Sequence, residues 1–361
     1  MFDIILKIDS KSLSFYRIIF GFFLLISNSI YRFNDFVKIP SQFKKYPSIA
    51  DFFDGFGSLL IHDIVTLVSF ISIYLFLVGY KVKISALIIF STFIFNYSFL
   101  FSIGGASSLF LIPFSTVVLG FTSCNSYYSI DAVLKKVNSK KYDALILSLL
   151  LVTISFSFFI SAFMKVKGGW LNVNSQAVFM LWGYNEIIDL REPLININNF
   201  HVSSKIFWEI SDYIIILVEA APFLFIWHKN LLKISLFSLG FFHIIVYLSL
   251  NISFSMFPLM YALFFLDNKD SKILRCFHFI LNKVFREANI KKVIVLTILS
   301  FPIYLIFYFL FRDSLSYNNI AFGYLIGLML SFLFLLTLAL ESFYTFIRLK
   351  VNNPLFLKNL H

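Results

Sequence analysis

The chain of 361 residues is 59% hydrophobic and only 14% charged, and its mean hydropathy is +0.86. This composition excludes an ordinary water-soluble globular domain and indicates an integral membrane protein. A formal net charge of +11 can indicate a nucleic-acid-binding protein, but here the basic residues lie between apolar runs and not in one patch. We therefore expect a lipid bilayer as partner and no nucleic acid.

Apolar runs long enough to cross a bilayer occur along the whole chain. A hydrocarbon core about 30 Å thick needs roughly 20 apolar residues per helix. The candidate spans are 13–31, 58–79, 85–101, 107–122, 144–164, 206–227, 231–249, 250–266, 293–312 and 321–343. The third, fourth and eighth are short. The sequence predicts an all-α, polytopic transmembrane helix bundle with about ten spans.

The lysines and arginines between these spans predict the orientation. With a cytoplasmic N-terminus, 20 of them fall in inner segments and 9 in outer segments. Basic residues are enriched on the cytoplasmic side of membrane proteins. We therefore expect both termini in the cytoplasm, in the inner (cytoplasmic) membrane, with Lys165 at the outer face. Cys124 and Cys276 then lie on the inner side, where thiols stay reduced.

Three connections between spans are longer than a turn requires. Residues 32–57 contain prolines and glycines and predict an external loop. Residues 166–205 include the apolar run 177–182, which is too short to span and predicts an interfacial or re-entrant segment. Residues 270–292 place apolar side chains at helical spacing among lysines and arginines, which is typical of a basic amphipathic helix on an anionic leaflet.

Lys165 closes the apolar run 144–164 and is the first candidate for chemistry. A lysine in this position can extend its ammonium group to the headgroups as an anchor. Alternatively, helix packing holds its amine in a poorly solvated cavity, where it acts as a general base. Gly168, Gly169 and Trp170 would then shape the mouth of that cavity, and Lys167 would face water.

His243 and Glu219 are ionisable residues inside predicted spans, where such residues are costly and are often functional. His243 can be catalytic, or it can be a neutral imidazole bonded to Ser249 or to a backbone carbonyl. Glu219 follows Glu209 and Asp212 on nearly one helix face, and it can pair with a cation, relay protons or join helices. We take Lys165 as candidate base, with His243 and Glu219 as further catalytic candidates.

Asn96, Gly104 and Gly105 surround the turn between the third and fourth spans, and with Trp170 they are candidate cavity-lining residues. The glycines permit close backbone approach, although a tight hairpin also explains them. Cysteines and histidines at metal-ligand spacing are absent, so we predict no metal. The sequence also has no ATPase, zinc-protease or serine-hydrolase motif.

Taken together, these stretches resemble the HTTM family, bacterial membrane domains similar to vitamin K-dependent gamma-glutamyl carboxylase. The resemblance runs from about residue 12 to 267 and rests on Ser14 to Gly21, Val78 to Lys81, Asn96, Gly104-Gly105, Ser129 to Ala132, Ser161 to Val166, Trp170-Leu171, Glu219 and Phe242-His243. It implies an HTTM-like transmembrane domain over 12–267, followed by the amphipathic segment 268–292 and a C-terminal pair of spans with a tail over 293–361.

The resemblance also implies a function. In the carboxylase, a lysine matching Lys165 deprotonates reduced vitamin K, so the implied activity is that of a carboxylase-like lyase with a reduced quinone as cofactor. The expected substrate is a peptide or lipid at the outer membrane face. The alternative is a non-catalytic maturation or export partner of a secreted antimicrobial peptide or toxin, as in the sporulation-delaying toxin-maturation proteins that also resemble this family.

Overall fold

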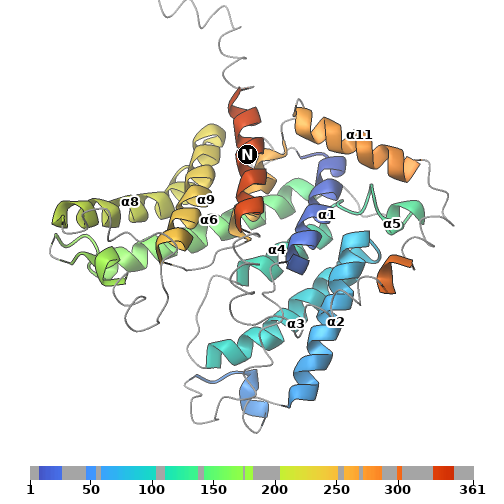
Figure 1. Cartoon of the computed structure of the whole chain (residues 1–361), viewed down its shortest axis with the longest axis horizontal. Helices are drawn as coiled ribbons and strands as arrows, with labels where there is room; N and C mark the ends of the chain where they lie inside the picture. The colour runs from blue at the N-terminus through green and yellow to red at the C-terminus, as the bar shows by residue number, and fades with distance from the viewer. Residues whose placement is uncertain are drawn as a thin grey trace, which may run out of the picture. The chain divides into compact units, whose positions relative to one another are not determined.

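The computed structural model describes residues 8–26, 46–53, 58–102, 110–136, 142–173, 175–181, 204–250, 256–267, 271–286, 299–302 and 328–344. These residues form helices and turns and contain no strand (Figure 1). They divide into two compact units, named here after a residue in each. The Arg17 unit comprises Leu6–Leu147 and Lys272–Gly327, and the Lys165 unit comprises Met1–Ile5, Ser148–Ser271 and Leu328–His361.

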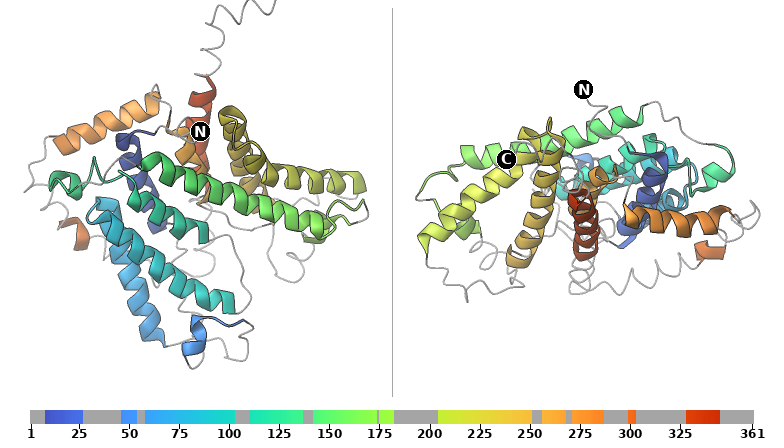
Figure 2. Two further views of the ribbon diagram at one scale, coloured as in Figure 1. Left: turned by 180° about the vertical axis from the view of Figure 1, so that it is seen from behind. Right: turned by 90° about the horizontal axis from the view of Figure 1, so that it is seen from above.

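The Arg17 unit is built on a helical hairpin. Its elements are α1 (Ser10–Ile26), η4 (Ile49–Phe52), α2 (Leu59–Val78), α3 (Val82–Ser102), α4 (Leu111–Phe121), α5 (Ile130–Val133) and α11 (Lys272–Arg286). Helices α2 and α3 run side by side, α3 packs on α4, and α1 packs on α2 (Figures 1 and 2). Helix α2 ends at Gly79, whose φ of 76° is left-handed and suits glycine.

The Lys165 unit holds the end of α6 (Asp143–Lys167), which begins in the Arg17 unit. Its other elements are α8 (Lys205–Leu224), α9 (Lys229–Leu250), α10 (Phe257–Ala262), η7 (Leu263–Phe265) and the helix Leu328–Tyr344. Helices α6 and α8 are antiparallel, because the rings of Phe159 and Phe223 lie 4.8 Å apart while Lys165, further along α6, meets Glu219, earlier in α8.

Most of the described helices lie within predicted apolar runs, but the described part of the run 250–266 holds only α10 and η7, which together are too short to span a bilayer. Four are long and apolar enough to cross a membrane: Leu60–Val78, Val82–Phe99, Asp143–Lys167 and Lys229–Leu250. Helix α8 is long enough but carries three carboxylates, and α4 and Leu328–Tyr344 are shorter. The span 293–312 lies largely outside the described residues. The all-helical fold is thus confirmed for the described residues, and their four long apolar helices are compatible with a membrane protein. The count of ten spans and the side of each terminus stay predictions.

A buried arginine joins the helices at one end of the Arg17 unit. Arg17 is fully buried, and among the described residues its guanidinium donates to backbone carbonyls: Nε to Cys124 (3.1 Å), Nη1 to Phe76 (2.7 Å) and Leu77 (2.9 Å), and Nη2 to Tyr128 (2.6 Å). The last carbonyls of a helix lack partners in the following turn, and the guanidinium supplies donors to them, with the carbonyl of Phe76 also accepting from the N–H of Gly79 at 3.2 Å. Arg17 therefore ties α1 to the end of α2 and to the turn after α4.

Asp131 and Gly79 complete this joint. The Asp131 carboxylate accepts from the backbone N–H groups of Lys81 (2.9 Å) and Val82 (3.3 Å), which opens α3. A Cβ at Gly79 would lie 2.5 Å from Arg17 Nη1, so only glycine fits there. Three of the stretches quoted for the HTTM resemblance, 14–21, 78–81 and 129–132, thus meet around Arg17 in a structural joint.

Candidate functional site

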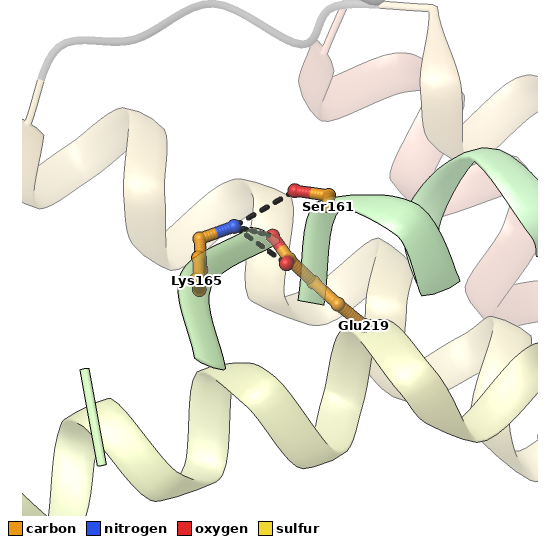
Figure 3. Close-up of polar contacts among 3 residues, drawn as sticks. All are labelled: Ser161, Lys165 and Glu219. Carbon is orange, nitrogen blue, oxygen red and sulfur yellow. Dashed lines mark hydrogen bonds and ion pairs between the residues drawn. The ribbon is translucent and has the colours of Figure 1, made fainter. Parts of the chain in front are cut away.

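The side chains of Lys165 and Glu219 form an ion pair between α6 and α8 (Figure 3). Lys165 Nζ lies 2.6 Å from Glu219 Oε1 and 2.5 Å from Oε2, and it donates to Ser161 Oγ at 2.8 Å. Ser161 precedes Lys165 by one helical turn, so the two share a face of α6. The amine thus has two carboxylate oxygens and one hydroxyl oxygen within hydrogen-bonding distance.

The end of α6 covers this pair from one side. The helix closes at Gly169, which has a φ of 86°, and the backbone N–H of Trp170 donates to the carbonyl of Lys165 at 3.1 Å. This turn sets the Trp170 ring 5.4 Å from Lys165 Nζ, in cation–π range. The side chains of Lys165 and Glu219 keep relative exposures of 20% and 7%. Lys165 is therefore neither a freely hydrated anchor nor an isolated amine, since its charge is paired inside the unit.

His243 lies in a second polar contact of the Lys165 unit. Its Nε2 is 2.8 Å from the hydroxyl of Tyr261, and the rings of Phe158 and Phe257 each lie 5.4 Å from the imidazole. The hydroxyl of Ser249, predicted as a possible partner, instead donates to the carbonyl of Ile245 in its own helix. Ser249 and His243 lie on different sides of α9, so Ser249 does not take the place of Tyr261 as the partner of the imidazole.

Both contacts lie in the Lys165 unit. The structure therefore brings together all three of the catalytic candidates, Lys165, Glu219 and His243, in one unit. Ser161, quoted in the sequence analysis only as part of the stretch Ser161 to Val166, and Tyr261 were not predicted as site residues, because a hydroxyl in an apolar helix carries no signal of its own.

The other two carboxylates of α8 have different surroundings. Asp212 is fully buried and accepts from the backbone N–H groups of Ala177 (2.9 Å) and Val178 (2.8 Å), so it caps the short helix 177–181. Glu209 is 7% exposed, and neither of its oxygens has a hydrogen-bond partner among the described residues. Asp212 is a structural cap for the segment that follows Trp170.

Asn96 belongs to the Arg17 unit. It lies within α3, is fully buried, and its amide has no hydrogen-bond partner in the described part of the chain. The rings of His62 in α2 and Phe99 in α3 meet edge to face with their centroids 4.9 Å apart, which sets the hairpin register and places Thr66, one turn further along α2, level with Asn96. Gly104 and Gly105 lie outside the described residues. Within the described ranges, no three His, Cys, Asp or Glu side chains are placed to hold a metal ion.

Arg17 is the buried residue that sequence reasoning left without a role. A charged residue within the apolar run 13–31 is itself a signal, because an arginine there must find partners inside the protein.

Comparisons with protein-family models, with curated proteins and with solved structures found no match to this chain. The HTTM resemblance therefore stays a prediction, and the function rests on the geometry of the Lys165 unit.

Proposed function

We propose that this chain is a multi-pass inner-membrane enzyme that modifies a peptide or lipid at the outer face, and that Lys165 and Glu219 transfer the proton in that reaction. The observation that carries the proposal is the contact of Lys165 Nζ with both carboxylate oxygens of Glu219, at 2.6 and 2.5 Å. Helix joining does not by itself require a lysine and a glutamate in α6 and α8, and ionisable groups in such helices are often functional.

The pair can move a proton without creating a net charge. When one Nζ proton passes to Glu219, the ion pair becomes a neutral amine beside a carboxylic acid, and burial favours neutral forms. The Lys165 amine can then accept a proton from a substrate C–H or O–H group, which leaves a substrate anion beside the new ammonium. Glu219 holds the first proton and gives it to the product anion before release, which restores the ammonium–carboxylate pair.

The residues around the pair fit the reduced quinone that the HTTM resemblance implies. The Trp170 ring offers an aromatic face 5.4 Å from the amine, and the amine can accept a proton from a phenolic hydroxyl. A bound quinone would supply the redox chemistry of a carboxylase-like reaction. The protein groups would hold the aromatic ring and accept the proton.

The proposal is tested by mass spectrometry of secreted peptides and membrane lipids. Strains lacking the gene are complemented with the wild-type chain, with Lys165→Met or with Lys167→Met. Lys167 is exposed and lies two residues further on, so it is a matched control. We expect a modified species in the wild-type and Lys167→Met strains that is missing from the Lys165→Met strain.

A charge-swapped variant, Lys165→Glu with Glu219→Lys, separates chemistry from structure. It keeps one ion pair between the helices but moves the amine to α8. Normal protein abundance without the modified species supports a catalytic lysine. Full function of the swapped variant would instead favour the non-catalytic maturation or export partner, in which the pair only joins α6 to α8.

A further inference from the structure

One end of the Arg17 unit gathers basic side chains from several elements. Lys11 lies in the first turn of α1, Lys81 and Lys83 flank the start of α3, and Lys135 and Lys136 follow α5. These elements meet at one end, because Arg17 bonds the end of α2 to the turn after α4, and Ser123 Oγ donates to Ser10 Oγ at 2.8 Å. Apart from Lys11, which is partly buried, these lysines are exposed.

The acidic side chains described at this end do not neutralise it. Asp131 and Asp143 are buried and accept hydrogen bonds from the protein, and among the described carboxylates there only Asp9 is exposed. In the described part of the unit, lysines therefore gather at one end, which is named here the positive end.

Helix α11 lies across the positive end, at a steep angle to α1 (Figures 1 and 2). Its inner face packs on the unit: the ring of Phe277 is 4.7 Å from that of Phe15, and Tyr128 Oη is 3.3 Å from His278 Nδ1. Its outer side leaves Phe279 72% and Ile280 50% exposed, and the exposed Lys272 lies in its first turn. If α1 crosses the membrane, as the apolar run 13–31 predicts, a helix in this position lies roughly in the plane of the membrane.

We propose that the positive end of the Arg17 unit binds anionic lipid headgroups, with α11 lying in the membrane interface. The exposed phenylalanine and isoleucine of α11 enter the boundary between headgroups and acyl chains, and the surrounding lysines contact the phosphates. This is the arrangement by which amphipathic helices bind anionic leaflets. The inference rests on charge and packing in the Arg17 unit and is independent of the proposed proton transfer.

The test uses the purified full-length protein in detergent, with phosphatidylglycerol or phosphatidylcholine added. We expect phosphatidylglycerol to raise the melting temperature, phosphatidylcholine to have little effect, and high salt to remove the difference. Since each lysine near an anionic surface contributes about fivefold in affinity, Lys135→Gln with Lys272→Gln should need about 25-fold more phosphatidylglycerol for the same shift. Lys167→Gln, outside this unit, is the control. Equal shifts from the two lipids, or an unchanged response of the double variant, would overturn the proposal.

A second measurement uses the native chain, so it does not depend on whether a variant folds. Cys276 in α11 is exposed and Cys124 is buried, so a thiol-reactive, polarity-sensitive dye attaches to α11 selectively. In nanodiscs containing phosphatidylglycerol we expect blue-shifted emission that headgroup-level quenchers reduce. The same emission in discs of phosphatidylcholine alone would contradict a role for anionic headgroups.

Discussion

The ammonium group of Lys165 loses hydration inside the Lys165 unit and gains two carboxylate contacts, and the balance of these terms decides what a substitution does. Removing one partner of a buried ion pair leaves the other charge unpaired, which costs more than the pair itself contributes. Removing both partners takes away the attraction and the desolvation cost together. The effects of single and double substitutions at Lys165 and Glu219 are therefore expected to differ sharply.

Lys165→Met and Glu219→Leu should each lower the free energy of unfolding by about 3 kcal/mol, since each leaves one unpaired charge. The double variant should recover most of that loss. Denaturation of the purified protein in a graded detergent series measures all four members of this cycle. Losses that simply add in the double variant would mean that the two side chains act independently, contrary to the ion pair.

Both members of this pair could be identified from the sequence one at a time, because each is an ionisable residue in or beside an apolar run. Their pairing could not be predicted, because they lie 54 positions apart on two different helices, and helical periodicity relates residues only within one helix. The same holds for Tyr261 and His243, which meet only because α9 and α10 pack together. Local spacing reveals partners on one helix, such as Ser161 and Lys165, but not on two.

At the scale of elements, the end of α2 depends on one glycine. Gly79→Ala should lower the free energy of unfolding by about 3 kcal/mol. An alanine at this position is strained by the left-handed backbone conformation, and its Cβ also clashes with neighbouring atoms. The clash arises because the new Cβ would meet Ser129 Cβ and would also lie 2.5 Å from Arg17 Nη1. Gly169, also left-handed with a φ of 86° but with nothing within 4 Å of its Cβ, is the matched control. Gly169→Ala should cost only about 1 kcal/mol, and equal losses at both glycines would show that Ser129 and Arg17 do not fill the space beside Gly79.

Helix α11 should make the stability of the Arg17 unit depend on pH through His278. Burial lowers the pKa of His278 from its ordinary value of 6.5, Asp9 opposes this shift, and Lys11 adds to it. Below about pH 6.5 the unfolded chain therefore takes up a proton at this position before the folded chain does, so stability falls as the pH falls. The contribution is fully present above the ordinary pKa and is lost as the pH falls through the lowered one.

His278→Gln should remove this part of the pH dependence. The measurement is the melting temperature between roughly pH 5 and pH 7.5, a window that brackets the ordinary histidine pKa. We expect the wild-type melting temperature to decrease more steeply on acidification than that of the variant. Parallel curves would mean that His278 binds protons equally in the folded and unfolded chains, which its contacts with Tyr128 and Phe15 argue against.

At the scale of the whole chain, the helices could be predicted from apolar runs, but their grouping could not. A side chain that faces lipid and one that faces a neighbouring helix are equally apolar, so the runs 85–101 and 231–249 give no sign of which helix they contact. The amphipathic segment 270–292 was the exception, because its charges mark one face, and α11 occupies Lys272–Arg286 within it. Lysine counts carry information on orientation only, which the arrangement of helices does not test.

Orientation can be measured with the two native cysteines. Cys276 is exposed on α11, at the end of the Arg17 unit where the lysines gather, and the positive-inside rule places that end in the cytoplasm. Cys124 is buried, and burial raises the pKa of its thiol to about 11, so it should not react near neutral pH. A membrane-impermeant maleimide should therefore label Cys276 in inverted membrane vesicles and leave intact cells unlabelled.

A cysteine at the opposite end of the unit provides the matching positive result. Phe52, in η4, is 87% exposed and lies in the predicted external loop, so Phe52→Cys in a Cys276→Ser background should be labelled in intact cells. Cys276→Ser alone should not be labelled in either preparation. Labelling of Cys276 in intact cells would reverse the orientation and would place Lys165 on the cytoplasmic side. The substrate of the proposed proton transfer would then have to be sought among cytoplasmic peptides and inner-leaflet lipids.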